Sequence, residues 1–161
     1  MSEKEERPHA SPACAVGEAD SAYMGYLGPA ELMERLNALI EAERAGAKVL
    51  LRLMRDHPEA ADALSEVQRD EGRYAGLLAR LVGDLGGTPS PRTGEFVQKV
   101  LALEGLRPRL ALLNRGQAWV LKCLDEILPR IADDAMHRAL AEMRDRHGAN
   151  IARCTSLLEQ L

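Results

Sequence analysis

Four long segments of this chain repeat apolar side chains at alternating spacings of three and four residues. That spacing places the side chains on one face of an α-helix, so each segment predicts an amphipathic helix with one buried stripe. Residues that favour helices are abundant, whereas only 3% of residues are aromatic, so we expect an all-α protein. The four stripes are Leu32, Leu36, Leu39, Glu43, Gly46, Leu50 and Leu53; Leu64, Val67, Glu71, Tyr74, Leu78, Leu81 and Leu85; Leu106, Leu110, Leu113, Gln117, Val120, Leu124 and Ile127; and Met136, Leu140, Met143, His147, Asn150, Cys154 and Leu157.

Proline, glycine and capping residues place the ends of these helices. The first helix begins at Pro29 and stops at His57-Pro58, and the second ends at the run 86–89. The third begins near Leu106, and the fourth begins at 133 or 134, where either aspartate can cap it. Short turns make each consecutive pair antiparallel. The central connection of roughly twenty residues, with a short helix around 95–103, can cross a bundle ~40 Å tall.

The length of 161 residues allows one domain with a real core and is short for two. Residues 1–27 form a tail that is polar at first and more apolar from Tyr23 to Leu27. We expect the first part of this tail to be disordered and the latter part to dock on the bundle. The bundle itself should comprise residues 28–161.

Each apolar stripe is interrupted by a hydrogen-bonding residue at a similar depth along its helix. These interruptions are Glu43, Glu71, Gln117 and His147, roughly 11 to 13 residues from the helix start, which at 1.5 Å per residue is near mid-height. Tyr74 and Asn150 follow one turn further along their helices. Four helices of similar length therefore bring these side chains to one buried polar layer. Unpaired buried carboxylates cost several kcal/mol or more, so protons, cations or a metal must compensate.

Glycines lie close to the same level in every helix, at positions 46, 72, 116 and 148. A glycine inside a helix costs about 0.5–1 kcal/mol relative to alanine. Its presence in each helix indicates either a close approach of backbones, with room for a bound species, or simply tight packing of Ala/Gly-rich helices.

The two hairpins, the long crossover and the polar layer together resemble the ferritin-like superfamily of carboxylate-bridged di-iron or di-manganese proteins. That pattern has Glu on the first helix, Glu-x-x-His on the second, Glu on the third and Glu-x-x-His on the fourth. In this chain three positions match the pattern: Glu43, Glu71 and His147. At three others the expected residue is replaced: Tyr74 stands for a histidine, and Gln117 and Arg144 each stand for a glutamate. The runs 114–119 and 22–26 also look like an uncharacterised bacterial group of ferritin-like domain proteins, a likeness that implies a fold but no reaction.

The three departures change what the polar layer can hold. A di-metal site needs four carboxylates to neutralise two divalent ions, and only two remain. Arg144, which flanks the stripe, could instead pair with Glu43 or Glu71 in a bidentate bridge. We favour a satisfied polar network without a cofactor. The alternatives are one Fe, Mn or Zn ion held by Glu43, Glu71 and His147, or a small organic ligand.

These observations predict a ferritin-like binding or structural module that is not catalytic, with a polar layer in place of a complete di-iron site. The alternative is a metal-dependent oxidoreductase with a mononuclear site and Tyr74 as a nearby hydrogen-bond or redox partner. No phosphate-binding loop, nucleophile elbow or Ser/His/Asp arrangement is present, so a dedicated nucleophile is not expected.

The net charge limits the kinds of binding partner that we expect, and the cysteines indicate the cellular compartment. A net charge of −4, with positive residues scattered among acids, argues against nucleic-acid binding. We expect no secretory signal and no membrane span, since no apolar run approaches ~18 residues. Three separated cysteines suggest a reducing cytoplasm, with Cys123 and Cys154 packed as small hydrophobes and only Cys14 reachable.

The sequence leaves two possible roles for each of two further features, the crossover and Trp119. An amphipathic crossover, with apolar residues Phe96, Val100, Leu101 and Leu103, either covers one groove of the bundle or forms a homodimer contact. Trp119 is expected to pack in the core with its N–H bonded, or else to line the polar layer.

Overall fold

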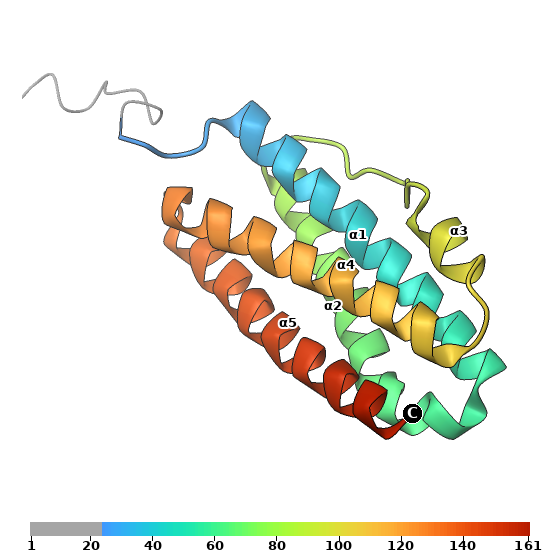
Figure 1. Ribbon diagram of the computed structural model, residues 1–161. Coiled ribbons are helices and arrows are strands. Elements are labelled where there is room, and N and C mark those ends of the chain that lie inside the picture. The colour runs from blue at the N-terminus through green and yellow to red at the C-terminus, as the bar shows by residue number, and fades with distance from the viewer. Residues whose placement is uncertain (1–23) are drawn as a thin grey trace, which may run out of the picture.

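The computed structural model describes residues 24–161 and shows a bundle of four long helices (Figure 1). Every regular element in that range is helical, so the predicted all-α class is confirmed. None of these helices is long and apolar enough to cross a membrane. The elements are α1 (Pro29–Asp56), η2 (Pro58–Ala60), α2 (Ala61–Asp84), α3 (Phe96–Leu101), α4 (Leu106–Ile127), η3 (Leu128–Arg130) and α5 (Asp134–Gln160).

Local chemistry explains where the helices start and stop. Pro29 occupies the first turn of α1, where its missing N–H removes no helical hydrogen bond. Asp133 caps α5, since its carboxylate accepts a 2.6 Å hydrogen bond from the N–H of Met136. Gly86 and Gly105 have φ values of 77° and 82°, in the left-handed region that glycine enters without steric cost, and they flank the two ends of the crossover.

The helices form two antiparallel hairpins joined by a long crossover, as expected. The helix α1 packs on α2, and α4 packs on α5. Across the bundle α1 lies beside α4 and α2 lies beside α5, while the crossover places α3 against both α1 and α4 (Figure 1). Val100 is fully buried there, so the crossover covers the groove between α1 and α4, which was one of its two expected roles.

The predicted stripes form the core with few exceptions. All seven predicted positions of α1 and all seven of α4 are buried. On the second stripe, however, Leu81 of α2 and Leu85, directly after α2, are only partly buried. Val82 and Asp70 of α2 face inward instead. A straight helix drifts about 20° per heptad from a strict 3,4 pattern, so the inward position moves along the sequence.

Of the expected tail, residues 1–23, with Cys14 among them, lie outside the described residues. The last tail residue, Leu27, is buried, and its N–H donates a 2.9 Å hydrogen bond to the carbonyl of Arg130. This bond ties the start of α1 to the turn between α4 and α5.

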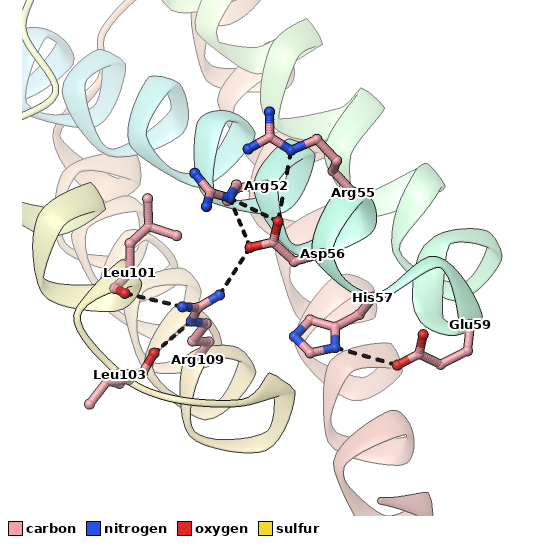
Figure 2. Close-up of polar contacts among 8 residues, drawn as sticks. All are labelled: Arg52, Arg55, Asp56, His57, Glu59, Leu101, Leu103 and Arg109. Atoms are coloured by element: carbon pink, nitrogen blue, oxygen red, sulfur yellow. Dashed lines mark hydrogen bonds and ion pairs between the residues drawn. The ribbon is translucent and has the colours of Figure 1, made fainter.

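Arg109 holds the crossover to the end of α1 (Figure 2). Its guanidinium donates hydrogen bonds to the carbonyls of Leu103, at 2.7 Å, and Leu101, at 3.2 Å, and also contacts Asp56 at 3.2 Å. Carbonyls that follow the end of a helix lack helical partners, so one planar cation satisfies two of them. Nearby, His57 follows α1 and lies 3.4 Å from Glu59.

Replacing this arginine should therefore loosen the crossover. We expect Arg109→Met to lower the free energy of unfolding by about 1–3 kcal/mol, because two carbonyls lose a charged donor. Urea denaturation followed by circular dichroism measures the change. The neighbouring Arg107 is exposed, so Arg107→Met is the matched control and should stay within about 0.5 kcal/mol of wild type. Equal effects of the two substitutions would contradict the anchoring role.

Candidate metal centre

A layer of polar side chains divides the hydrophobic core into two clusters at mid-height. One cluster surrounds Leu36, Leu78 and Leu124, and the other surrounds Leu50, Leu64 and Leu110. Between them lie four side chains, one from each long helix, each at most 2% exposed: Glu43, Glu71, Gln117 and His147. These are the residues that interrupt the predicted stripes, so equal depth along four helices does bring them to one level.

Three of these side chains form a compact group. Glu43, Glu71 and His147 each offer one oxygen or nitrogen atom, and these atoms all lie within 4.8 Å of one another. The closest pair is His147 Nε2 and Glu43 Oε1, at 3.0 Å. The helices α1, α2 and α5 therefore point three ligand-type groups at one small volume.

The backbone determines which nitrogen of His147 faces this volume. Nδ1 lies 3.1 Å from the carbonyl oxygen of Met143, one turn earlier on α5. Since a carbonyl only accepts hydrogen bonds, Nδ1 carries the proton, and in the neutral ring Nε2 presents a lone pair. A histidine that binds a metal has this arrangement, in which the distal N–H is held by a backbone carbonyl.

The expected satisfied hydrogen-bond network is not what the structure contains. Within the described residues, both carboxylate oxygens of Glu43, Oε1 of Glu71 and Nε2 of His147 are buried without a hydrogen-bond partner of proper geometry. A lone pair on Nε2 facing an ionised Glu43 would be repulsive. Either a proton or a cation must lie between them.

Burial also shifts the titration of both acids. Removal from water raises the pKa of Glu43 well above its ordinary value, and the charge of Asp70 adds to the shift. Removal from water likewise raises the pKa of Glu71, and the charge of Glu43 raises it further. Without a cation, the carboxyls are therefore driven toward their protonated forms.

One glycine makes room for this group, and the others near the same level do not. A Cβ built on Gly46 would overlap Oε2 of Glu71 and lie 2.8 Å from its Cδ. By contrast, a Cβ on Gly116 would meet Phe96 of the crossover, and Cβ atoms on Gly72 and Gly148 would meet nothing within 4 Å. Close approach therefore explains Gly46 and Gly116 but not the other two.

The remaining expected members of the layer lie around the compact group. Tyr74 is buried, with its ring centroid 6.0 Å from that of His147 and its hydroxyl without a partner among the described residues. Gln117 donates a weak 3.7 Å hydrogen bond to Cys154 Sγ. Asn150 bonds instead to Asp70 at 3.1 Å, on the side of the layer where α2 faces α5.

The expected bridge from Arg144 to Glu43 or Glu71 is wrong. The Arg144 side chain is 43% exposed and bonds to Asp125 at 2.7 Å and Asp145 at 3.3 Å. A long cation on the flank of the stripe reaches exposed carboxylates without the desolvation that a buried bridge requires. Among residues 24–161, therefore, no arginine pairs with either of the two buried glutamates.

Sequence reasoning missed Asp70, which is 7% exposed and accepts the hydrogen bond from Asn150. The signal was its place directly before Glu71 and three residues after Val67, at the edge of the inward face of α2. Arg146 lies 3.8 Å from its carboxylate, so this acid, unlike Glu43, has partners.

A pocket of about 410 Å³ opens between α1 and α4 and reaches the polar layer at Glu71 and Gln117. Trp119 lies in its wall and is 47% exposed, so the expectation that this ring packs in the core is wrong. Its position on α4, two residues after the inward-facing Gln117, turns the ring away from the core.

Comparisons with known proteins identify the fold and the family. A crystal structure titled "ferritin like, diiron-carboxylate proteins" from Bacillus anthracis str. Ames is similar to this chain, with a TM-score of 0.60 and 20% identity over 82% of this chain and 93% of that chain. The protein therefore has a ferritin-like fold. It belongs to the family described as Domain of unknown function (DUF6306), which matches residues 30–156. Among proteins with curated descriptions, none is significantly similar.

The residues present do not fit the pair of metal ions found in carboxylate-bridged ferritin-like sites. Such sites draw on four carboxylates and two histidines. Within the described residues, the group that could hold a metal contains only two carboxylates and one histidine. That set does fit one divalent ion, because two carboxylates neutralise its charge and the imidazole presents a lone pair.

The crowding at Gly46 leads to a prediction. We expect Gly46→Ala to displace the Glu71 carboxylate and lower the free energy of unfolding by about 1–3 kcal/mol. The matched control, Gly72→Ala in open space on α2, should raise it by about 0.5–1 kcal/mol. Thermal and urea unfolding measure both variants. Stabilisation by both substitutions would show that Gly46 does not make room for Glu71.

The raised pKa values of Glu43 and Glu71 predict how the stability of the metal-free chain depends on pH. Above the ordinary pKa of 4.5, the folded chain keeps protons that the unfolded chain releases. The free energy of unfolding should therefore fall as pH rises from 4.5 toward the raised values. The pKa values of Glu41 and Glu66 are lowered, so these two acids change the pH dependence of stability below pH 4.5, outside this range.

Urea unfolding of chelator-treated protein between about pH 5 and pH 8 tests this dependence. The Glu43→Gln variant has one fewer buried acid, so its stability should decline less steeply. Identical slopes for wild type and variant would refute the assignment to Glu43.

Proposed function

We propose that this protein is a ferritin-like binding module that holds one divalent transition-metal ion, Fe, Mn or Zn, between Glu43, Glu71 and His147. One observation carries the proposal: three buried side chains offer ligand atoms within 4.8 Å of one another. Each of these side chains has at least one buried oxygen or nitrogen without a hydrogen-bond partner of proper geometry among the described residues. Burial without partners is costly for a protein, and a bound cation removes that cost.

Charge balance supports one ion over two. Two ionised carboxylates neutralise a single divalent ion, and a second ion would leave two positive charges in an apolar core. The mixed oxygen and nitrogen donors suit Mn, Fe or Zn better than Mg or Ca, which prefer oxygen alone. When bound, such an ion supplies a Lewis acid at the centre of the bundle.

The chain's own residues prepare this site. The Met143 carbonyl orients the His147 ring, and Gly46 leaves the space that the Glu71 carboxylate occupies. Apolar clusters lie above and below the ligands. Rigid helices, with no loop among the ligand-bearing elements, hold all three groups.

A metal-dependent oxidoreductase is the second candidate function, and the pocket that reaches Glu71 favours it. A reactant entering between α1 and α4 would meet the polar layer without any opening of the bundle. Oxygen uptake by protein loaded with Fe(II), compared with the Glu71→Gln variant, tests this candidate. Uptake equal to that of free Fe(II) would count against it.

The cytoplasm is the compartment we propose. Cys154 is fully buried and burial raises its pKa to about 11, while Cys123 is half-buried and unpaired, so neither described cysteine forms a disulfide. Free cysteines are typical of a reducing compartment.

Metal analysis tests the main proposal. Protein purified without chelator, stripped, and titrated with Mn(II), Fe(II) or Zn(II) should bind one ion per chain. Its free energy of unfolding should rise with the logarithm of the ratio of metal concentration to Kd. Glu71→Gln should weaken binding by more than about 100-fold, since loss of an outer partner of a ligand already costs about 10–100-fold.

The control is Asp70→Asn, which alters a buried acid next to Glu71 that lies outside the group of three. It should bind one ion with nearly the affinity of wild type. Two ions per chain, or none with any of the three metals, would overturn the proposal.

A further inference from the structure

The pocket between α1 and α4 is a mainly apolar space that the crossover borders on one side. Ala38, Ala42 and Ala45 line it from α1, and Leu113 and Gly116 line it from α4. Thr93 and Phe96 of the crossover complete the lining. At about 410 Å³ it falls within the range of pockets that bind small molecules.

Small side chains keep this space open. Three alanines on one face of α1 leave room that larger side chains would fill. Gly116 lets Phe96 approach, because a Cβ there would lie 2.8 Å from the phenyl ring. The crossover therefore packs at the edge of the groove while its centre stays free.

At the inner end, the pocket meets a buried hydrogen-bond acceptor. Gln117 is 2% exposed, and its Oε1 has no partner among the described residues. Its Nε2 contacts Cys154 Sγ at 3.7 Å, which leaves the oxygen as the free end of the amide. A buried carbonyl without a donor costs about 1–3 kcal/mol, so a donor from a ligand would be favoured there.

The other polar groups of the pocket do not offer a binding site for a charged ligand. Glu41 is already paired with Arg92 at 3.2 Å and with Ser90. Arg115 and Trp119 lie at the exposed mouth. At the inner end, none of the lining residues is a buried cation that could hold an anion. An ammonium group would have to lose its water shell to reach that end. The lining thus suits an uncharged molecule with an apolar body.

We infer that this pocket binds a small apolar alcohol, whose hydroxyl donates a hydrogen bond to Oε1 of Gln117. The alkyl or aryl body lies along the alanine face of α1, beneath Phe96. Gln117 is not one of the three residues assigned to the metal ion, so this binding does not require the ion.

Trp119 supplies the measurement, because it is the single tryptophan of the chain and lies in the pocket wall. Titration of the full chelator-treated chain with 1-octanol should change its fluorescence with saturation. The isomeric ether 1-methoxyheptane matches the alcohol in size but cannot donate, so it should bind about tenfold more weakly, as expected for one lost hydrogen bond. 1-Octylamine should also bind more weakly than the alcohol, because its charge must leave water.

Two variants locate the site. Gln117→Met removes the acceptor with little change of shape and should abolish the preference for the alcohol over the ether. Ala42→Leu fills the pocket and should weaken both probes, whereas Ala47→Leu, on the same helix but outside the pocket lining, should leave both unchanged. Circular dichroism verifies folding of each variant.

Equal affinity for the alcohol and the ether, tighter binding of the amine, or unchanged selectivity in Gln117→Met would each overturn the inference. So would affinities of Ala42→Leu for both probes that equal those of wild type. Because the titration uses metal-free protein, none of these results depends on whether the metal ion binds.

Discussion

The burial of two carboxyl groups against one imidazole is the constraint around which this bundle is organised. Glu43, Glu71 and His147 lie at the level where the apolar core divides in two. Such a group is unfavourable in a dry core unless protons or a cation compensate its charge. An apolar layer would have been simpler for stability alone, so the polar layer points to function.

Several surrounding features follow from this group. Gly46 is needed because the Glu71 carboxylate occupies the place of a side chain on α1. The turn of α5 that contains Met143 holds the ring of His147. At the positions where a di-metal protein has further ligands, this chain carries the neutral Tyr74 and Gln117 and an exposed arginine, Arg144. With glutamates absent at 117 and 144, the two remaining carboxylates balance the charge of one divalent ion instead of two.

The pocket and the polar layer meet at Glu71 and Gln117, so the layer can be approached through the space between α1 and α4. Small residues on α1 and the crossover above them create this access. The same crossover is anchored at its far end by Arg109 (Figure 2). The long connection therefore both completes the fold and shapes the approach to the buried groups.

The sequence alone determined the four helices, their pairing and the depth of the polar layer. These depend on periodicity, on turn residues and on the constant rise of a helix, all of which are local. It also predicted that Glu43, Glu71 and His147 are buried, because a side chain on the apolar stripe of a helix faces the core whatever its polarity. The helical period alone would have turned Trp119, two residues after Gln117, away from the core. The placement of Arg144 and Asp70 was not predictable in this way. Those residues lie on the flanks of their stripes, where a rotation of a few tens of degrees decides between core and solvent. Only the packing of neighbouring helices sets that rotation, and only the tertiary structure shows that the space between α1 and α4 remains open.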